Sequence, residues 1–221
     1  MKKIILDLCG GTGSWSAPYK EAGYEILNIT LPDYDVFAVD FFDEDMEFRS
    51  RTGKESLYAR HEDIVGIFAA PPCTEFSIAR NHKLARDTEG GMEIVNACLD
   101  IIKKCNPVFY AIENPIGVLS KFLGKPQYTF QPYEFGDAWT KRTMLWGNFN
   151  FPIKRFKKYT DIPPIEGLYV RPGRKTASIA FNHLGHKRFI RAFDNFTATD
   201  DASFRAITPK GFAEAFYKAN P

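Results

Sequence analysis

The sequence predicts an open α/β sheet, and three observations lead to this fold class. Short, almost wholly apolar runs recur along the chain, which is typical of buried parallel strands. Segments with the apolar spacing of a one-faced helix stand between them. Each apolar run ends in a glycine-rich or polar turn. In a sheet built from alternating strands and helices, the turns at the carboxyl ends of the strands are where ligands bind.

The expected elements follow in chain order. Strands are expected at Lys3–Leu8, Glu25–Leu31, Ile64–Ala70, Val108–Ile112, Thr129–Phe135 and Thr143–Trp146. Helices are expected at Ser14–Ala22, Met92–Lys104 and Pro209–Lys218. The middle helix has one apolar face and ends at Asn106-Pro107, because proline cannot continue a helix. The last helix opens with Pro209 after the capping candidate Thr208.

Composition sets the broad class. The chain has 221 residues, of which 44% are hydrophobic and 25% charged, with a net charge of +2. These values are typical of one folded domain with a small appendage and argue against disorder. No apolar run is long enough to span a membrane, and the short apolar stretch after Met1-Lys2-Lys3 is too short for a secretory signal. A cytoplasmic protein is therefore expected.

The cysteines and histidines predict neither disulfides nor a metal. The four cysteines favour a reducing compartment, and no pair has the C-x-x-C spacing of a zinc site. His183 and His186 are three residues apart, but no second pair of ligands lies near them. Two surface or structural histidines are the expected interpretation.

The net charge hides an uneven distribution. Residues 151–193 carry a net charge of +8, which leaves −6 on the rest of the chain. Aromatic residues are interleaved with these cations, a composition that suits binding to nucleic acid. The alternative is a solvated basic surface packed onto the body through the aromatics. The cations are Lys154, Arg155, Lys157, Lys158, Arg171, Arg174, Lys175, Lys187, Arg188 and Arg191.

A glycine-rich turn follows the first expected strand. Asp7–Ser16 contains three glycines, which let the backbone turn tightly and approach a ligand closely. The pattern matches neither the dinucleotide fingerprint nor the P-loop. An acid shortly before the glycines is closer to a turn that holds S-adenosylmethionine, with Asp7 or the loop amides serving the methionine group. Glycine turns after strands are common, so a turn without a cofactor is the alternative.

A cysteine follows two prolines at the end of the central strand. Pro71 and Pro72 stiffen this turn, so Cys73 is expected at the ligand edge of the sheet. A thiol held in this way suits a nucleophile. The alternative is a small buried apolar residue, a common fate of free cysteine.

A carboxylate ends the next strand. Glu113, in Glu113–Pro115, is expected to face the same crevice as Cys73. A buried carboxyl can be held protonated and can donate to a ring nitrogen, so the two residues form a candidate nucleophile and proton donor. The alternative is an acid at the N-terminus of a helix over Ile116–Phe122.

Together these residues resemble the cytosine-C5 DNA methyltransferase family. Asp7–Ser16 is similar to its cofactor-binding glycine motif, and Pro71–Ser77 to its Pro-Cys-Gln-x-Phe-Ser nucleophile motif. Glu113–Pro115 is similar to its Glu-Asn-Val motif and Lys141-Arg142 to its Gln-x-Arg-x-Arg strand. Arg205–Asn220 resembles the closing motif. The five occur in family order, in a layout most similar to the compact methylases carried by phages.

The resemblance implies a class I S-adenosylmethionine-dependent methyltransferase fold (Rossmann-like), an open, mostly parallel sheet with helices on both faces. It also implies methyl transfer from S-adenosylmethionine to C5 of cytosine in DNA, through a covalent Cys73 adduct at C6, with S-adenosylhomocysteine as product. The implied catalytic residues are Cys73, Glu113 and Arg142. The implied cofactor-binding residues are Asp7, Cys9, Gly10, Gly11, Thr12, Gly13, Ser14, Trp15, Asp33, Asp35, Pro71 and Thr208. The implied substrate-binding residues are Pro72, Ser77, Asn114, Lys141, Arg174, Lys175, Lys187 and Arg188. No metal is implied.

The chain departs from the family pattern in ways that set its expected domains. Thr74 replaces a glutamine and Pro115 a valine, and the second strand lacks an acid at its tip, so Asp33 or Asp35 would bind the ribose. The expected domains are a catalytic core at 1–150, a small basic insertion at 151–200 and a C-terminal helix returning to the core at 201–221. The insertion leaves no room for the large target-recognition domain of the family.

The choice of substrate stays open. DNA is the expected partner, while a free cytidine nucleotide such as dCMP, or RNA, would suit the reduced recognition region. Another alternative is a non-catalytic nucleic-acid-binding module on the same fold. An enzyme that methylates an exocyclic amine is less well supported, because Ala70 and Cys73 flank the prolines where such enzymes carry Asp or Asn and an aromatic residue. The target sequence and oligomeric state are not determined by these patterns. Phage coding would place the protein in the host cytoplasm.

Overall fold

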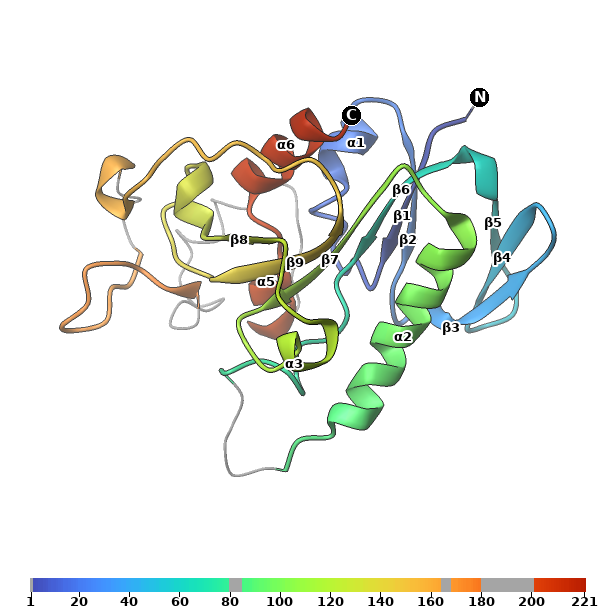
Figure 1. The fold of residues 1–221 in the computed structure, drawn as a ribbon, viewed down its shortest axis with the longest axis horizontal. Coiled ribbons are helices and arrows are strands. Elements are labelled where there is room, and N and C mark those ends of the chain that lie inside the picture. The colour runs from blue at the N-terminus through green and yellow to red at the C-terminus, as the bar shows by residue number, and fades with distance from the viewer. Residues whose placement is uncertain (1, 80–84, 164–167, 180–200) are drawn as a thin grey trace.

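A six-stranded sheet in the order β2-β1-β6-β7-β9-β8 forms the centre of the molecule (Figure 1). The computed structural model describes residues 2–79, 85–163, 168–179 and 201–221. The four strands β2, β1, β6 and β7 are parallel, and β9 runs antiparallel to β7 and to β8. The expected open and mostly parallel sheet is confirmed. Its strands are β1 (Ile4–Leu8), β2 (Glu25–Ile29), β6 (Ile64–Ala69), β7 (Phe109–Pro115), β8 (Tyr128–Phe130) and β9 (Thr143–Asn148).

Helices cover both faces of this sheet, as expected. The long helix α2 (Thr88–Cys105) lies on one face, and α1 (Ala17–Glu21) and α6 (Lys210–Ala219) lie on the other (Figure 1). Side chains alternate along β1: Leu6 packs in the apolar cluster on the α2 side, and Ile5 packs in the cluster on the α1 and α6 side. All five residues of β1 are buried because both faces are covered.

Aromatic rings fill the face under α1 and α6. The Trp15 indole stacks on Phe68 with ring centroids 4.5 Å apart, and Phe130 stacks on Phe212 of α6 at 3.9 Å. The Tyr19 hydroxyl donates to the main-chain oxygen of Asn220 at 2.6 Å. These contacts hold the C-terminal helix on the sheet, and they place Trp15 in the core.

A second, three-stranded antiparallel sheet interrupts the alternation of strands and helices. It is made of β3 (Tyr34–Phe41), β4 (Asp45–Ser50) and β5 (Ser56–Arg60). Met46 and Phe48 on β4 are fully buried in the α2-side cluster, and Met46 lies 3.6 Å from the sulfur of Cys105. The apolar pattern did not predict these strands, because their other face is charged and exposed.

The parallel strands run downwards in Figure 1, so the turns at their carboxyl ends lie on the lower side of the sheet.

The remaining elements are short. The short helices are α3 (Ser120–Leu123) and α5 (Asp201–Ala206), with the 3₁₀ turns η1 (His61–Asp63), η2 (Pro132–Phe135) and η3 (Tyr159–Asp161).

Several expected boundaries were wrong. The strand expected at Thr129–Phe135 ends at Phe130, because Pro132 begins the 3₁₀ turn η2. The helix expected from Ser14 begins at Ala17, since residues 14–16 still belong to the glycine turn. The strand expected at Val108–Ile112 continues to Pro115, because it pairs with β9 along its whole length.

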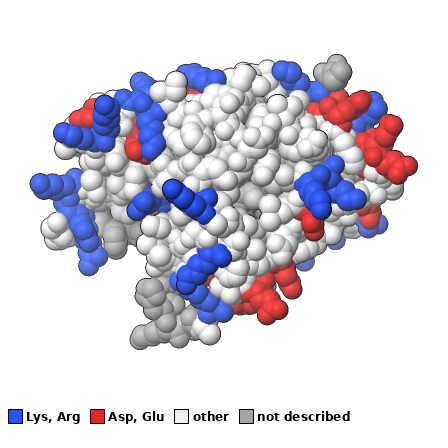
Figure 2. Space-filling model, viewed as in Figure 1, with Lys and Arg blue, Asp and Glu red and all other residues white. Residues whose placement is uncertain are grey.

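Charged side chains are spread unevenly over the face shown in Figure 2. Lys and Arg outnumber Asp and Glu towards the end formed by the segment after β9, whereas Asp and Glu are mixed with Lys and Arg at the β3–β5 end. Among the described residues, no helix is both long enough and apolar enough to cross a bilayer.

Candidate functional site

The glycine turn joins β1 to α1 at the carboxyl edge of the sheet. Cys9, Gly11 and Gly13 have positive φ angles of 55°, 56° and 71°. A side chain built on Gly11 would meet no other atom within 4 Å, so a ligand can reach the backbone there. Two side chains of the β2 end hold the turn: the Thr30 hydroxyl accepts from the Gly11 amide at 3.2 Å, and Asn28 donates to the Gly11 oxygen at 3.0 Å.

Asp7 lies beneath this turn and is almost completely buried. The Ser16 hydroxyl donates to its Oδ2 atom at 2.5 Å, and Oδ1 has no hydrogen-bond partner among the described residues. Burial raises the pKa of Asp7 to about 6, although the hydrogen bonds from Ser16 lower it. Ser16, Asn28 and Thr30 were not among the predicted residues. Ser16 lies within the glycine motif, but the contribution of β2 depends on pairing between strands.

The other predicted cofactor residues fall into three groups. Ser14 and Thr12 lie in the turn, and the Ser14 hydroxyl accepts from the amide of Thr208 at 2.8 Å, so the segment before α6 closes beside the turn. Pro71 is buried at the end of β6. Asp33 is exposed, and the Asp35 carboxylate accepts from the amide of Phe37 at 3.1 Å. The assignment of ribose binding to either acid stays a prediction.

A methyl group at Gly10 tests the importance of this turn. A Cβ atom there would lie 2.4 Å from Cγ of Asp7 and 2.7 Å from Oδ1 of Asn28. We expect Gly10→Ala to displace both side chains, to destabilise the protein by about 1–3 kcal/mol and to weaken cofactor binding by at least about tenfold. Calorimetric titration with S-adenosylhomocysteine and thermal unfolding measure the two effects. Gly53→Ala, in a distant turn, is the control for backbone strain alone: its φ of 68° disfavours alanine although no atom lies within 4 Å of its Cβ, so it should lose stability and keep wild-type affinity for the cofactor. Wild-type affinity in Gly10→Ala would contradict the prediction.

The turn after β6 carries Cys73. The oxygen of Cys73 accepts from the amides of Phe76 and Ser77 at 3.0 and 2.8 Å, so the turn closes on itself directly after the cysteine. Phe76 is fully buried and anchors the turn in the core, whereas Cys73 is exposed. The alternative that Cys73 is a small buried apolar residue is therefore wrong.

Glu113 lies within β7, beside β6, the strand that leads into the Cys73 turn. The Nζ atom of Lys141 lies 3.6 Å from Oε1 of Glu113, and these side chains are only 14% and 15% exposed. The alternative that Glu113 begins a helix over Ile116–Phe122 is wrong, because the helix there is only α3, which starts at Ser120.

The charges around Cys73 act in opposite directions. Desolvation and then the Glu113 carboxylate raise the pKa of the Cys73 thiol, while the cations of Lys141 and Arg205 lower it. Arg205 lies on α5, and its Nε atom donates to the main-chain oxygen of Asp201 at 2.9 Å. The sequence placed Arg205 in the closing motif but gave it no role at the thiol.

Arg142 does not join this group. Its side chain is exposed, and its main-chain oxygen accepts from the amide of Ile116 at 3.0 Å. Lys141, predicted to bind substrate, is the cation that the fold brings to Glu113. The catalytic role assigned to Arg142 therefore stays a prediction that the observed ion pair does not support.

The predicted substrate residues divide between the turn and the basic segment. Asn114 is fully buried, and its amide donates to the oxygen of Pro71 at 3.0 Å, so it joins β7 to the Cys73 turn. Pro72 is exposed beside Cys73, while Ser77 is buried and its hydroxyl accepts from the amide of Ala79 at 3.1 Å. The predicted basic residues are Arg174 and Lys175, which are exposed, and Lys187 and Arg188, which lie outside the described residues.

The described part of the basic segment packs on the core beside the site. The Tyr159 hydroxyl donates to the oxygen of Ala138 at 2.7 Å and accepts from the amide of Ala177 at 3.2 Å. The Thr140 amide donates to the oxygen of Ala177 at 2.9 Å. Residues 177–179 therefore lie next to the stretch that carries Lys141. The contacts of Tyr159 support the interpretation that aromatic residues pack this segment onto the body, and the exposed Arg174 and Lys175 are still available to bind a polyanion.

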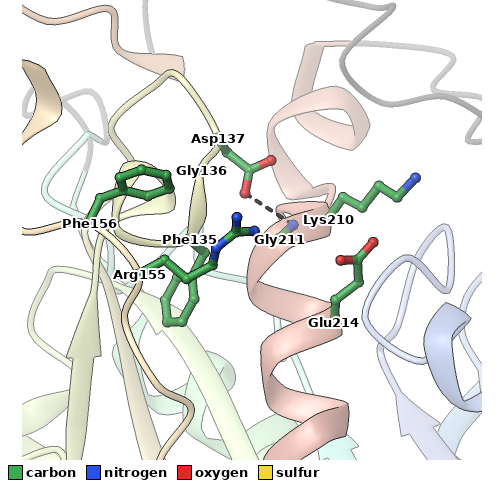
Figure 3. A pocket seen from close by; sticks show the side chains of 8 residues that line it. All are labelled: Phe135, Gly136, Asp137, Arg155, Phe156, Lys210, Gly211 and Glu214. Carbon is green, nitrogen blue, oxygen red and sulfur yellow. Dashed lines mark hydrogen bonds between the residues drawn. The ribbon is translucent and has the colours of Figure 1, made fainter. Parts of the chain in front are cut away.

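A separate pocket of about 310 Å³ lies between the loop after η2 and the start of α6 (Figure 3). Its lining mixes cations and carboxylates, and it contains none of the predicted catalytic residues. Asp137 accepts from the Gly211 amide at 3.2 Å, so it caps α6 from outside the helix. The lining residues are Phe135, Gly136, Asp137, Arg155, Phe156, Lys210, Gly211 and Glu214.

Asp137 predicts a pH dependence of stability. Burial raises the pKa of Asp137 from 3.8 to about 7, with a smaller opposing effect of the Gly211 amide. Because the folded state then binds the proton more tightly than the unfolded state, the free energy of unfolding should rise as the pH falls from about 8 to about 5. Asp137→Asn should remove up to about 1.4 kcal/mol per pH unit of this slope. Urea unfolding across this pH range measures the slope; an unchanged slope in Asp137→Asn would contradict the assignment.

No group of three or more His, Cys, Asp or Glu side chains capable of holding a metal occurs in the described ranges. His183 and His186 lie outside them.

The parallel sheet, its glycine turn, the Cys73 turn after β6 and Glu113 on the neighbouring strand β7 define a methyltransferase-type α/β protein. The family model of the C-5 cytosine-specific DNA methylase matches residues 4–130, more than half of the chain. The chain belongs to this family.

Two further similarities are partial. Over 134 residues the chain is 28% identical to the type II methyltransferase M.DdeI of Desulfomicrobium norvegicum, a match that covers 56% of this chain and 30% of that protein. The chain thus spans about a third of the length of this curated relative. A crystal structure described as a DNA modification methyltransferase encoded within a prophage (E. coli) aligns with a TM-score of 0.45 and 14% identity, over 78% of this chain and 56% of that one.

Proposed function

We propose that this protein transfers a methyl group from S-adenosylmethionine to C5 of cytosine in DNA. The observation that carries the proposal is that the exposed Cys73 lies within electrostatic range of the ion pair between Glu113 and Lys141, at the carboxyl edge of the sheet. Membership of the cytosine-specific methylase family supports the same chemistry.

Cys73 is the proposed nucleophile. Cytosine C5 is too electron-poor to attack a methyl group unaided. Addition of the Cys73 thiolate at C6 converts C5 into a nucleophilic enamine carbon, which can attack the methyl group. After C5 has accepted the methyl group, a base removes the C5 proton, and the electron pair returns to the ring and expels the thiolate from C6. The thiol has a raised pKa before substrate binds, so it must lose its proton as the adduct forms.

Glu113 and Lys141 are proposed to stabilise the adduct. Charge builds up on the ring as the thiolate adds, and Glu113 would hydrogen-bond or protonate N3 where that charge collects. The Lys141 ammonium fixes the carboxylate of Glu113 and offsets the negative charge near the thiol. Both groups are mostly buried, so their interactions are weakly screened.

The glycine turn is the proposed cofactor site. S-adenosylmethionine, when bound, supplies the methyl group in electrophilic form. The open space above Gly11 and the unpaired Oδ1 atom of Asp7 fit a ligand held against this turn. The predicted residues of the turn, Cys9 to Ser14, would hold the methionine part, and Thr208 would close the site from the α6 side.

DNA is the proposed substrate, and residues 151–200 are its proposed recognition region. The exposed cations Arg174 and Lys175 lie in the segment that returns to Thr140, beside the Glu113–Lys141 pair. Phosphate contacts from such a segment would orient a strand over Cys73. A duplex would also have to release the target base from its stack, at a cost of a few kcal/mol.

Transfer of radiolabelled methyl groups to four substrates tests the proposal. Duplex DNA, single-stranded DNA, RNA and dCMP are assayed in parallel, and the label is located by digestion to nucleosides. Label in 5-methyldeoxycytidine from DNA supports the proposal. Label in RNA alone or in dCMP alone would show that this molecule, and not DNA, is the substrate. Absence of label in all four substrates, with intact cofactor binding, would favour a non-catalytic binding module.

A further inference from the structure

The turn that carries Cys73 is held on the β7 side by three hydrogen bonds, one from a side chain and two between main-chain groups. The side-chain Nδ2 of Asn114 donates to the main-chain oxygen of Pro71 at 3.0 Å. The main-chain amide of Val118 donates to the oxygen of Phe76 at 2.9 Å, and that of Ile78 donates to the main-chain oxygen of Ile116 at 3.2 Å. These contacts fix one flank of the turn to the sheet.

Arg86 holds the opposite flank. Its guanidinium donates from Nη1 to the oxygen of Glu75 at 2.5 Å and from Nη2 to the oxygen of Ser77 at 3.1 Å. The two carbonyl groups are two residues apart on the turn, so the planar guanidinium bridges both at once. A charged donor makes each hydrogen bond stronger than a neutral one.

The start of α2 ties this clamp to the body of the protein. The amide of Asp87 donates to Oε2 of Glu75 at 2.8 Å, and Oδ1 of Asp87 accepts from the Gly90 amide at 2.9 Å as the helix cap. Arg86 and Asp87 therefore join the nucleophile turn to an 18-residue helix whose inner face is buried in the core.

We propose that Arg86 is a positioning residue for the Cys73 nucleophile. By holding the carbonyl groups of Glu75 and Ser77, it sets the course of the turn and with it the place of the Cys73 sulfur relative to Glu113 and Lys141. This inference rests on the proposed role of Cys73. Arg86 contacts no reacting atom and acts through the backbone. An error of about 1 Å in the position of a reacting group can lower a rate by about 100-fold.

Three variants in the full-length chain test this role. Arg86→Gln keeps polar atoms but loses the charged fork, Arg86→Lys keeps the charge, and Arg51→Gln changes an exposed arginine in the turn between β4 and β5. We expect Arg86→Gln to lower kcat by about 10- to 100-fold with little change in the KM for S-adenosylmethionine, because the glycine turn is not altered. Arg86→Lys should recover part of kcat, and Arg51→Gln should equal the wild type.

A second readout does not depend on methyl transfer. The rate at which iodoacetamide alkylates Cys73 is followed against pH by peptide mass spectrometry. A displaced turn changes the distances of the thiol from Glu113 and Lys141, so the pH profile of Arg86→Gln should shift relative to the wild type and Arg51→Gln. Loss of stability alone, monitored by thermal unfolding, would leave this profile in place below the melting transition.

The outcomes separate this inference from the proposed function. Wild-type kcat and an unchanged alkylation profile in Arg86→Gln would overturn the role of Arg86 and leave the proposed function standing. A shifted profile in a protein that methylates none of the four substrates would support the clamp and overturn the proposed function. Should Arg86→Gln fail to fold, Arg86→Lys decides by the same two readouts.

Discussion

Replacement of Cys73 by alanine is expected to abolish methyl transfer. The proposed reaction passes through a bond between the Cys73 sulfur and cytosine C6, and no other side chain in the described site offers a nucleophile at that place. We expect kcat to fall by roughly 10⁴-fold or more. Binding of S-adenosylhomocysteine should stay within about twofold of the wild type, because the glycine turn lies at the end of a different strand.

A covalent trap and a matched cysteine variant make this result specific. DNA with 5-fluorocytosine should form a stable adduct with the wild type and none with Cys73→Ala, since fluorine at C5 blocks the loss of a proton. Cys105→Ala alters a buried thiol beside Met46 at the C-terminal end of α2, whereas the Cys73 turn is tied to the N-terminal end of this helix, so the variant should keep wild-type kcat. Turnover by Cys73→Ala at the wild-type rate would show that the mechanism is wrong.

The raised pKa of the Cys73 thiol adds a pH dependence to this prediction. Desolvation and the carboxylate of Glu113 disfavour the thiolate, so kcat/KM should rise with pH across the neutral range. Alkylation of Cys73 by iodoacetamide should rise over the same range. A rate that falls as the pH rises through neutrality would mean that a different group limits the reaction.

Loss of Lys141 is expected to have the next largest effect. Removing one partner of a mostly buried ion pair leaves the other charge without compensation, and the carboxylate of Glu113 is then free to leave its position. We expect Lys141→Ala to lower kcat by about 100-fold, the size of effect typical of a disturbed acid or base. Lys141→Arg should recover part of the rate, because it restores the charge.

The neighbouring Arg142 provides the comparison. The resemblance assigns the catalytic role to Arg142, whereas the ion pair assigns it to Lys141, so the two alanine variants compare the two assignments directly. We expect the smaller loss in Arg142→Ala. Lys121→Ala, an exposed lysine on α3, is the control for a general change in charge. A larger loss in Arg142→Ala than in Lys141→Ala would restore the assignment made from the sequence.

The Cys73 turn and the candidate Glu113 could be predicted because each depends on local sequence. Glycines after an apolar run, two prolines before a cysteine and a carboxylate at a strand end are short patterns with direct physical meanings. The parallel strands that bring these turns together are equally visible as apolar runs. The Cys73 turn and Glu113 then come together because β6 and β7 are parallel neighbours in the sheet.

The β3–β5 sheet and the clamps could not be predicted in this way. The β3–β5 strands bury one face on α2 and expose charged residues on the other, so their apolar signal is weak. Arg86 follows Glu75 and Ser77 of the Cys73 turn by 11 and 9 residues along the chain. Nothing in its local sequence indicates that its guanidinium returns to the carbonyl groups of Glu75 and Ser77.

The sequence by itself determined the class of sheet, the strand ends at which chemistry is expected and the candidates Cys73 and Glu113. Only the tertiary structure decided which cation faces Glu113, which side chains hold the glycine turn and what clamps the nucleophile turn. The physical reason is that an apolar run specifies its own burial, whereas an ion pair or hydrogen bond between distant segments depends on the register of β7 with β9 and of β1 with β2. Lys141 and Arg142 are adjacent just before β9, yet Lys141 is mostly buried against Glu113 and Arg142 is exposed, a difference that depends on how this segment lies against β7.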